Sequence, residues 1–437
     1  MSHYKPDPNK NVNLTINGIP VTVPEGTRIL EAAKKANVHI PILCDHPDLC
    51  RRSVCRLCVV ECDGREKLIA ACANDVWEGV NIVTNNTRLL NIRRTIIELL
   101  LANHPNDCLN CIRNKNCSLQ TLAAEFNISN FTFSHTVDCP EKNEDKADVI
   151  VRDMAKCIKC GRCTEACQVN QGICAINSSA RGVHYSIVTP YSQSLEESPC
   201  VFCGHCAKVC PVGAIHEKEQ ISDVIKHLRK PENNVFIQFN PSLTEEINET
   251  MGFPEGTITP GKIITALKLL GFKKVFDATI SENASLNNEI QELLKRKKNG
   301  GALPLLSGCH PGFAKFVTSF FPDLKDRLYK GKSPQEFFDT DDGSMTVSLE
   351  QCLAKKYKAK NIVLTASEIV LMFKMRQINL KALSESVFDV FSNEEQASVP
   401  LEINIITCGS YSDAGKILEA VRRGECDADY IKISGCI

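Results

Sequence analysis

Short-spaced cysteines are the residues of this sequence with the clearest chemistry. Two runs have the pattern C-x2-C-x2-C-x3-C, and Pro211 follows the second run. This spacing is typical of proteins that hold two 4Fe–4S clusters, where the last cysteine of each run serves the other cluster. The sequence therefore predicts one cluster on Cys157, Cys160, Cys163 and Cys210, and another on Cys167, Cys200, Cys203 and Cys206.

Two further ligand sets precede these runs. The spacing C-x10-C-x2-C-x13-C predicts a 2Fe–2S cluster, with a zinc site or merely buried cysteines as the alternatives. The spacing H-x3-C-x2-C-x5-C can hold a 4Fe–4S cluster or zinc, and its place between two cluster segments favours the cluster. The first set is Cys44, Cys55, Cys58 and Cys72, and the second is His104, Cys108, Cys111 and Cys117.

The elements that must position these ligands follow from the local patterns. Alternating residues around Asn17-Gly18 predict a hairpin, and the following amphipathic segment predicts a helix with Thr27 as its N-cap. A hairpin, a helix and a cysteine-rich loop are the opening of a β-grasp 2Fe–2S domain. A helix is predicted over 85–101 and a charged linker over 140–150. From Asn234 onward, strands and helices alternate, which indicates an α/β domain with largely parallel strands.

The predicted fold class is thus multidomain, α+β and α/β. Four units are expected: a β-grasp 2Fe–2S domain, a one-His/three-Cys 4Fe–4S module, a two-cluster 4Fe–4S ferredoxin-like domain, and a reduced α/β domain. Their expected boundaries are 1–91, 92–138, 139–220 and 221–437.

Composition agrees with metal binding. The chain has 437 residues and 24 cysteines, of which 19 fall in residues 44–210. Disulfides are disfavoured in a reducing compartment, so metal ligation is the default interpretation of so many cysteines. The formal net charge of −1 gives no argument for a nucleic-acid partner. No apolar run is long enough to span a membrane and no signal peptide is visible, so we expect a cytoplasmic protein.

Four of the five cysteines in the second half share a placement. Each comes directly after a predicted short strand, and in open α/β sheets ligands bind beyond the carboxyl ends of the strands. These residues are Cys309, Cys352, Cys408 and Cys436, whereas Cys426 falls at a predicted helix end. The pattern predicts a metal or cofactor site, either present or vestigial. The simpler alternative is that these are ordinary buried cysteines.

The order of these modules resembles the large subunit of complex I, some molybdenum formate dehydrogenases and modular iron-only (FeFe) hydrogenases. The second half distinguishes them. LPLLSGCHPGF is similar to a hydrogenase loop of the type TSCCPGW, SLEQCLAKKYK to MPCTAKK, and DADYIKISGC to the start of FIEVMACPGGC. No molybdopterin-type domain is found. The sequence thus resembles a degenerate iron-only hydrogenase large subunit, of the type found in electron-bifurcating NADH/ferredoxin and formate dehydrogenase-associated complexes.

The departures from that family bear on its H-cluster. His310 stands where the family has its first cubane ligand, and Cys309 matches the preceding, proton-transferring cysteine. Cys352 and Cys436 match the second and third ligands, with 83 residues between them. The fourth ligand position lies beyond Ile437, Glu350 and Gln351 replace Met-Pro, and Lys355 matches a lysine that contacts the diiron cyanide. We therefore predict no H-cluster. Two outcomes are equally open: an empty structural remnant, or a rebuilt 4Fe–4S cluster on Cys352 and Cys436, completed by Cys309 or His310 and by Cys408.

The resemblance implies an electron-transfer subunit with no catalytic residues of its own. Its cofactors would be one 2Fe–2S cluster and three 4Fe–4S clusters, with the C-terminal cluster as an open addition. Its partners would be an NADH-oxidising FMN flavoprotein subunit, a small 2Fe–2S subunit, ferredoxin and, in some complexes, a formate dehydrogenase. No nucleotide-binding fingerprint is present, so NADH and flavin chemistry is expected in a partner. A catalytic FeFe hydrogenase with unusual H-cluster ligation is the alternative, and a sensor is a third, weaker one.

Overall fold

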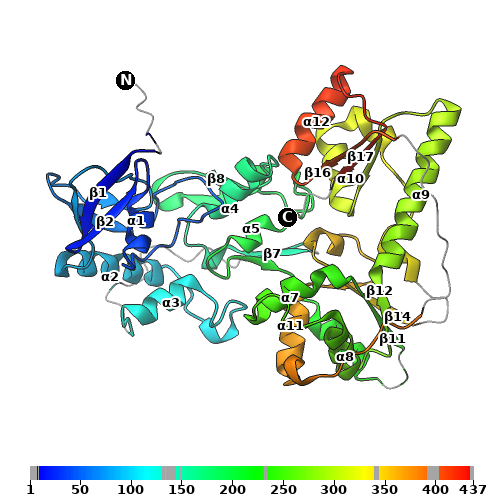
Figure 1. Cartoon of the computed structure of the whole chain (residues 1–437), viewed down its shortest axis with the longest axis horizontal. Coiled ribbons are helices and arrows are strands. Elements are labelled where there is room, and N and C mark those ends of the chain that lie inside the picture. Colours follow the sequence, from blue (N-terminus) through cyan, green and yellow to red (C-terminus); the bar gives the residue numbers. More distant parts are fainter. Residues whose placement is uncertain are drawn as a thin grey trace.

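A computed structural model describes most of the chain. The described residues are 9–129, 144–147, 149–230, 234–338, 344–390 and 403–433, with the single residues 7, 133 and 232. The modules follow one another from the β-grasp unit, through a central cysteine-rich unit, to two sheet units that a long helix connects (Figure 1). No helix among the described residues has both the length and the apolar character needed to cross a membrane.

The first module has the predicted β-grasp topology. Asn17 and Gly18 both have positive φ, as the turn of a two-residue hairpin requires, so the predicted hairpin is confirmed. The predicted N-cap at Thr27 is wrong, because Arg28 is the N-cap residue and its backbone N–H donates to the Glu31 carboxylate at 3.4 Å. The sheet has the order β2 (Ile19–Pro24), β1 (Asn11–Ile16), β5 (Asn81–Val83), β3 (Val59–Cys62) and β4 (Ile69–Ala70), packed against α1 (Ile29–Lys35).

The central part of the chain is made of short elements around cysteine-rich loops. The helix predicted over 85–101 is α2 (Thr87–Ala102), and His104 follows it. The segment predicted as a charged linker contains a short strand and otherwise lies largely outside the described residues. The remaining elements are α3 (Ser118–Glu125), a sheet of β10 (Ile215–Glu217), β7 (Ile150–Asp153) and β6 (Glu144–Lys146), the hairpin β8 (Asn177–Ser179) and β9 (Ser186–Val188), and the one-turn helices α4 (Arg162–Glu165) and α5 (His205–Lys208).

The C-terminal half contains two separate parallel sheets, where the sequence indicated only parallel strands. The first has the order β12 (Lys274–Asp277), β11 (Val235–Phe239), β14 (Met345–Leu349) and β15 (Ile362–Leu364). The helices α6 (Ile221–Leu228), α7 (Thr244–Met251), α8 (Pro260–Leu270) and α11 (Ala366–Met375) pack with it. The second has the order β13 (Leu305–Gly308), β17 (Tyr430–Ile433) and β16 (Ile405–Cys408), with α10 (Pro311–Phe320) and α12 (Tyr411–Arg423).

One long helix joins the two sheets. Helix α9 (Ala278–Asn299) begins directly after β12 and ends shortly before β13, and it runs along one side of both units (Figure 1). The chain then returns from β13 in the second sheet to β14 in the first. As a result, strands close in sequence contribute to different sheets, and loops from both sheets meet between them.

Two hydrophobic cores connect the modules. One core, which we call the junction core, joins the three N-terminal modules through Leu43, Leu57, Ile97, Leu119, Leu122, Val212 and Ala214, with Cys55, Cys117, Cys157 and Cys210 packed against it. The other joins the central unit to the second C-terminal sheet, since it contains Cys200, Phe202, Phe313, Cys352 and Tyr411. The cysteine-rich loops therefore form one packed series.

Candidate iron–sulfur centres

The four cysteines predicted to hold the 2Fe–2S cluster lie together in the structure. The Cys44 thiol hydrogen bonds with those of Cys55 and Cys72, and Cys72 also hydrogen bonds with Cys58. These hydrogen bonds lower the pKa of Cys44, and the Cys55 backbone N–H donates to its sulfur at 3.5 Å. Four convergent, partly buried sulfurs near loop amides fit a 2Fe–2S cluster.

A buried arginine hydrogen bonds to the backbone beside the 2Fe–2S cysteine loop. Arg93 on α2 is only 2% exposed, and its guanidinium donates to the carbonyl oxygens of Leu57, Val59 and Thr84. None of these partners carries a charge. The Arg93 charge therefore favours negative charge at the adjacent Cys58, which is what thiolate ligation requires.

The one-His/three-Cys set is also brought together. His104 is buried, its Nδ1 accepts a hydrogen bond from the Asn106 N–H at 3.3 Å, and its Nε2 has no hydrogen-bond partner among the described residues. Cys108 lies close enough to Cys111 and Cys117 for their charges to raise its pKa, although burial is the larger cause. A buried imidazole nitrogen without a partner beside three cysteines fits a metal or cluster ligand.

The same module makes a close contact with the central unit. A Cβ atom at Gly213 would lie 2.7 Å from the Cys111 sulfur, so only glycine fits at this position. The Ser118 N–H also donates to the carbonyl of Pro211, directly after the second ferredoxin run. The one-His/three-Cys loop and the Cys210 loop are therefore in direct contact.

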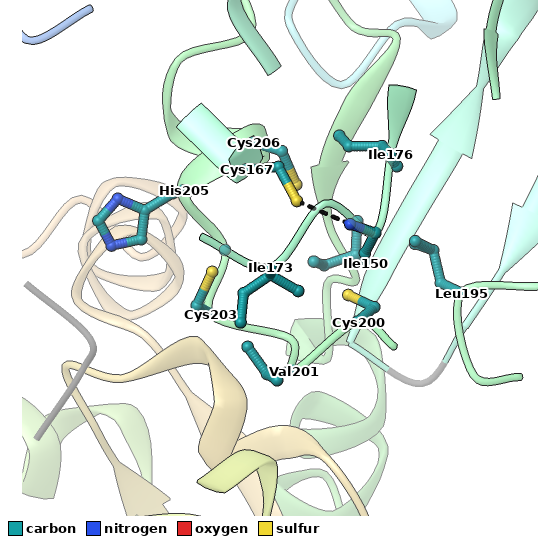
Figure 2. Close-up of a pocket in the computed structure, with 12 residues that line it drawn as sticks. Ile150, Cys167, Ile173, Ile176, Leu195, Cys200, Val201, Cys203, His205 and Cys206 are labelled. Atoms are coloured by element: carbon teal, nitrogen blue, oxygen red, sulfur yellow. Dashed lines mark hydrogen bonds between the residues drawn. The ribbon is translucent and has the colours of Figure 1, made fainter. Parts of the chain in front are cut away.

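The two ferredoxin runs form two cavities with the predicted crossed composition. One cavity is lined by Cys157, Cys160 and Cys163 of the first run and by Cys210, the last cysteine of the second. A second cavity is lined by Cys200, Cys203 and Cys206 together with Cys167, the last cysteine of the first run. Figure 2 shows the four side chains of this second cavity turned toward one space, with Ile150 and Ile173 beside them. Four convergent sulfurs in an apolar cavity fit a 4Fe–4S cluster.

One buried arginine contributes to the electrostatics of both cavities. Burial raises the pKa of Cys157 to about 11 and that of Cys200 to about 12, and the charge of Arg152 opposes both shifts. Arg152 lies on β7, is 5% exposed and donates to the carbonyl of Ile187 at 3.0 Å. The neighbours of Arg152 reach both cavities, since Ile150 lines one and Ile187 the other. A positive charge thus lies between the two cluster sites.

In the C-terminal half, the structure brings three of the five predicted residues together. The ligand atoms of Cys309, His310 and Cys352 all lie within 4.8 Å of one another, and no other set of three or more His, Cys, Asp or Glu residues in the described ranges meets this spacing. Cys309 and His310 follow β13 of one sheet, and Cys352 follows β14 of the other. Cys352 takes part in a disulfide in this structure. The site therefore lies at the meeting point of the two sheets.

The remaining predicted ligands do not join this set. Cys408 ends β16, on the far side of β17 from β13, and it is not part of the close group of three. Cys436 lies outside the described residues, as does Cys139. Cys426 lies in the loop between α12 and β17, and Cys50 and Cys174 are exposed. Cys62 is buried in the β-grasp core.

The C-terminal site is surrounded by two side chains that the sequence analysis named, Lys355 and Glu350, and by one that it missed, Tyr411. The Lys355 ammonium is bound to the Glu350 carboxylate at 2.6 Å, and both are nearly buried. Burial disfavours the Lys355 charge, but Glu350 raises the pKa of Lys355 above its usual value. Tyr411, 101 residues away, lies 3.2 Å from His310 Nε2. The replacement of Met by Glu350 was visible in the sequence, whereas nothing in the sequence indicated Tyr411 or Arg152.

The sequence matches four described families in the order of these sites. Residues 9–87 match a 2Fe-2S iron-sulfur cluster binding domain, and residues 93–131 match the NADH-ubiquinone oxidoreductase-G iron-sulfur binding region. Residues 156–214 match a 4Fe-4S dicluster domain. Residues 233–400 match the C-terminal domain of the iron only hydrogenase large subunit. The predicted fold class is confirmed, while the domain boundaries stay predictions.

Two known proteins resemble the chain over nearly its whole length, and a third resembles about half of it. The NADP-reducing hydrogenase subunit HndD of Solidesulfovibrio fructosivorans is 33% identical over 94% of this chain and 75% of its own. Iron hydrogenase 1 of Clostridium pasteurianum is 28% identical over 93% of this chain and 72% of its own. An NADH-quinone oxidoreductase subunit of Streptomyces coelicolor is 32% identical, over 48% of this chain and 25% of its own. The chain therefore belongs to the iron-only hydrogenase large-subunit family, as an iron–sulfur electron-transfer protein with 2Fe–2S and 4Fe–4S domains.

Proposed function

We propose that this chain is the electron-wiring subunit of a multisubunit, flavin-based electron-bifurcating NAD(P)H/ferredoxin oxidoreductase that lacks a working H-cluster. Bound clusters would supply a series of one-electron carriers. The residues of this chain would hold them: Cys44, Cys55, Cys58 and Cys72 for the 2Fe–2S cluster, His104, Cys108, Cys111 and Cys117 for one 4Fe–4S cluster, and the two crossed cysteine sets of the central unit for the other two.

The observation that carries this proposal is the junction core. Ligands from three of the four predicted sets, namely Cys55, Cys117, Cys157 and Cys210, pack against it. The β-grasp domain and the one-His/three-Cys module therefore both pack against the loops that line the cavity of Cys157 and Cys210. The second cavity lies against the C-terminal half. Gly204 lines this cavity, and a Cβ built on Gly204 would lie 2.8 Å from the Leu353 side chain. Such a branched series suits a subunit that takes electrons from more than one partner.

The partners are part of the same proposal. Two of the relatives are named as subunits, one of an NADP-reducing hydrogenase and one of an NADH-quinone oxidoreductase, which supports a multisubunit assembly. We propose an NADH-oxidising FMN flavoprotein subunit and a small 2Fe–2S subunit at the N-terminal modules, with ferredoxin as the one-electron partner. A formate dehydrogenase is a further partner in this scheme.

The buried pair beside the C-terminal site supports the absence of an H-cluster. Lys355 is already neutralised by Glu350 at 2.6 Å, so the lysine offers little attraction to an added anionic group. His310 also replaces a thiolate with a neutral ligand, because burial lowers its pKa to about 3. The alternative is a hydrogenase with unusual ligation. The observation in its favour is that Lys355 lies close enough to Cys309 for its charge to act on the thiol.

The test is infrared spectroscopy of the full chain after co-expression with hydrogenase maturation proteins under anaerobic conditions. The wiring proposal expects no CO or CN stretching bands and no hydrogen evolution from a reduced dye. It also expects iron and sulfide contents that match one 2Fe–2S and three 4Fe–4S clusters. CO and CN bands together with hydrogen evolution would establish the catalytic alternative instead.

A second experiment tests the partner requirement. NADH alone should leave the clusters of the isolated chain oxidised, whereas addition of the co-purified flavoprotein should bleach their visible absorbance. Reduction by NADH without any flavoprotein would contradict the assignment of NADH chemistry to a partner.

A further inference from the structure

The tight spacing of the C-terminal ligand set distinguishes it from the four cluster sites. Ligand atoms of Cys309, His310 and Cys352 lie within 4.8 Å of one another, a condition that no set of three ligands at the other four sites meets. In a 4Fe–4S cluster each ligand binds a different iron, which keeps the ligands apart. Around one tetrahedral zinc ion, with Zn–S bonds of about 2.3 Å, two sulfurs lie only about 3.8 Å apart. The spacing therefore fits a single ion better than a cluster.

The donor set and its charge also fit such an ion. Two thiolates and one imidazole are ligands that zinc prefers, and two thiolates balance a divalent charge. The neighbouring Lys355–Glu350 pair is neutral as a whole, so it neither requires an anion nor repels a cation. His310 and Cys352 are buried, at 5% and 6% exposure, which favours a closed site.

The surroundings of His310 hold the ring in the form that binds metal. The Nδ1 atom accepts a hydrogen bond from the Gly312 N–H at 3.1 Å, so the neutral ring carries its proton on Nε2. That N–H can donate to the Tyr411 oxygen at 3.2 Å. A ligating histidine usually donates its other ring N–H to such a partner, which fixes the tautomer. The Nδ1 lone pair is then the one available to an ion, in place of the Gly312 hydrogen bond.

We propose that Cys309, His310 and Cys352 bind a single zinc ion that joins the two C-terminal sheets. The described residues supply three ligands, and a water would complete the tetrahedron. Ion binding requires reduction of the Cys352 disulfide to a thiol. Thiols are normally kept reduced in a reducing compartment. The inference does not depend on the proposed electron-wiring role, because it concerns a site that none of the four predicted cluster sets shares.

The test uses the full chain, purified anaerobically with a thiol reductant and loaded with its iron–sulfur clusters. Elemental analysis should find one zinc per chain that survives desalting. The Cys309→Ser variant should lose that zinc, with at least a tenfold weaker affinity in a chelator competition, while its iron content stays unchanged. Cys426→Ser is the matched control and should keep both metals.

Cobalt substitution provides a second measurement. Its spectrum reports metal ligation directly, so residues with a merely structural role would not produce it. Co²⁺ alone, added to the zinc-depleted chain, should give the visible bands of tetrahedral cobalt and a sulfur-to-cobalt charge-transfer band. Because His310 also caps α10, a His310→Ala variant can fail to fold. His310→Cys is therefore the informative change, and it should keep the metal and strengthen the charge-transfer band.

Three results would overturn the proposal. One is a loss of about four irons per chain in Cys309→Ser, which would establish a cluster at this site. Another is the absence of stoichiometric zinc or cobalt binding by the reduced chain. The third is a Cys352 disulfide that persists under full reduction, as measured by thiol labelling and mass spectrometry.

Discussion

The buried arginine between the two ferredoxin cavities leads to a quantitative prediction. Arg152→Gln removes one positive charge and keeps a hydrogen-bond donor toward the Ile187 carbonyl. Arg152 pairs in register with Ile215, which lines one cavity, and Ile150 on the same strand lines the other. For a unit charge acting over a separation on the order of 9 Å, at an effective dielectric constant of about 20, the energy of adding one electron changes by about 1.8 kcal/mol.

This energy corresponds to about 80 mV for a one-electron couple. The sign follows from the charge, because an electron is easier to add near a cation. We therefore expect Arg152→Gln to lower the reduction potentials of both 4Fe–4S clusters of the central unit, and to leave the 2Fe–2S potential nearly unchanged. The assay is an anaerobic redox titration followed by electron paramagnetic resonance, in which the clusters have separable signals.

Two controls separate charge from packing. Arg152→Lys keeps the charge and should recover most of the wild-type potentials. Arg181→Gln removes an exposed arginine, whose charge is screened by solvent, and should change little. Unchanged potentials in a fully loaded Arg152→Gln protein would refute the reasoning. Equal shifts in the Gln and Lys variants would also refute it, since they would indicate a packing effect.

Three other predictions concern ligation, pH and stability. Cys210→Ser should remove the cluster of the first run and keep the cluster of the second, whereas Cys174→Ser at an exposed cysteine should keep both, as measured by iron content and electron paramagnetic resonance. Burial raises the pKa of Glu217, despite the nearby Lys356 charge, so its contribution to stability is present below about pH 4.5 and is lost as pH rises through the folded pKa. Glu217→Gln should thus gain in melting temperature relative to wild type between pH 5 and 8, and a constant difference would contradict this. Lys356→Met should destabilise the C-terminal half by about 3–5 kcal/mol, because it leaves the Glu368 carboxylate buried without its partner at 2.7 Å. Anaerobic urea unfolding should show that Lys356→Met combined with Glu368→Gln is less destabilised than Lys356→Met alone.

The way the short-spaced cysteines come together was predictable because it depends mostly on local sequence. A CxxC pair sits on one short loop, so spacing alone indicates that both sulfurs point the same way. The crossed composition of the two ferredoxin cavities also followed from the spacing pattern. The hairpin at Asn17-Gly18 was equally local, since both residues favour the positive φ of its turn. The helix start was missed by one residue because the Thr27 hydroxyl donates to the Pro24 carbonyl instead, while the Arg28 N–H donates to Glu31.

The C-terminal site was only partly predictable because it is built from long-range contacts. The strands before Cys309 and Cys352 were identified, but not their membership of different sheets. Strand β13 pairs with β17, more than 100 residues later in the chain, and no local signal indicates that partner. The Tyr411–His310 contact has the same origin. Periodicity indicates strands, while only tertiary packing decides which strands share a sheet.

The junction core limits how this chain can be divided into separately folding domains. Leu43 and Leu57 come from the β-grasp module, Ile97 and Leu119 from the next, and Val212 from the central unit. A cut at a module boundary would expose the apolar side chains that the other modules cover. These modules are therefore not interchangeable cassettes. Maturation of the chain should insert its N-terminal clusters into one cooperative body, and exchange between related enzymes should move the first 220 residues as a block.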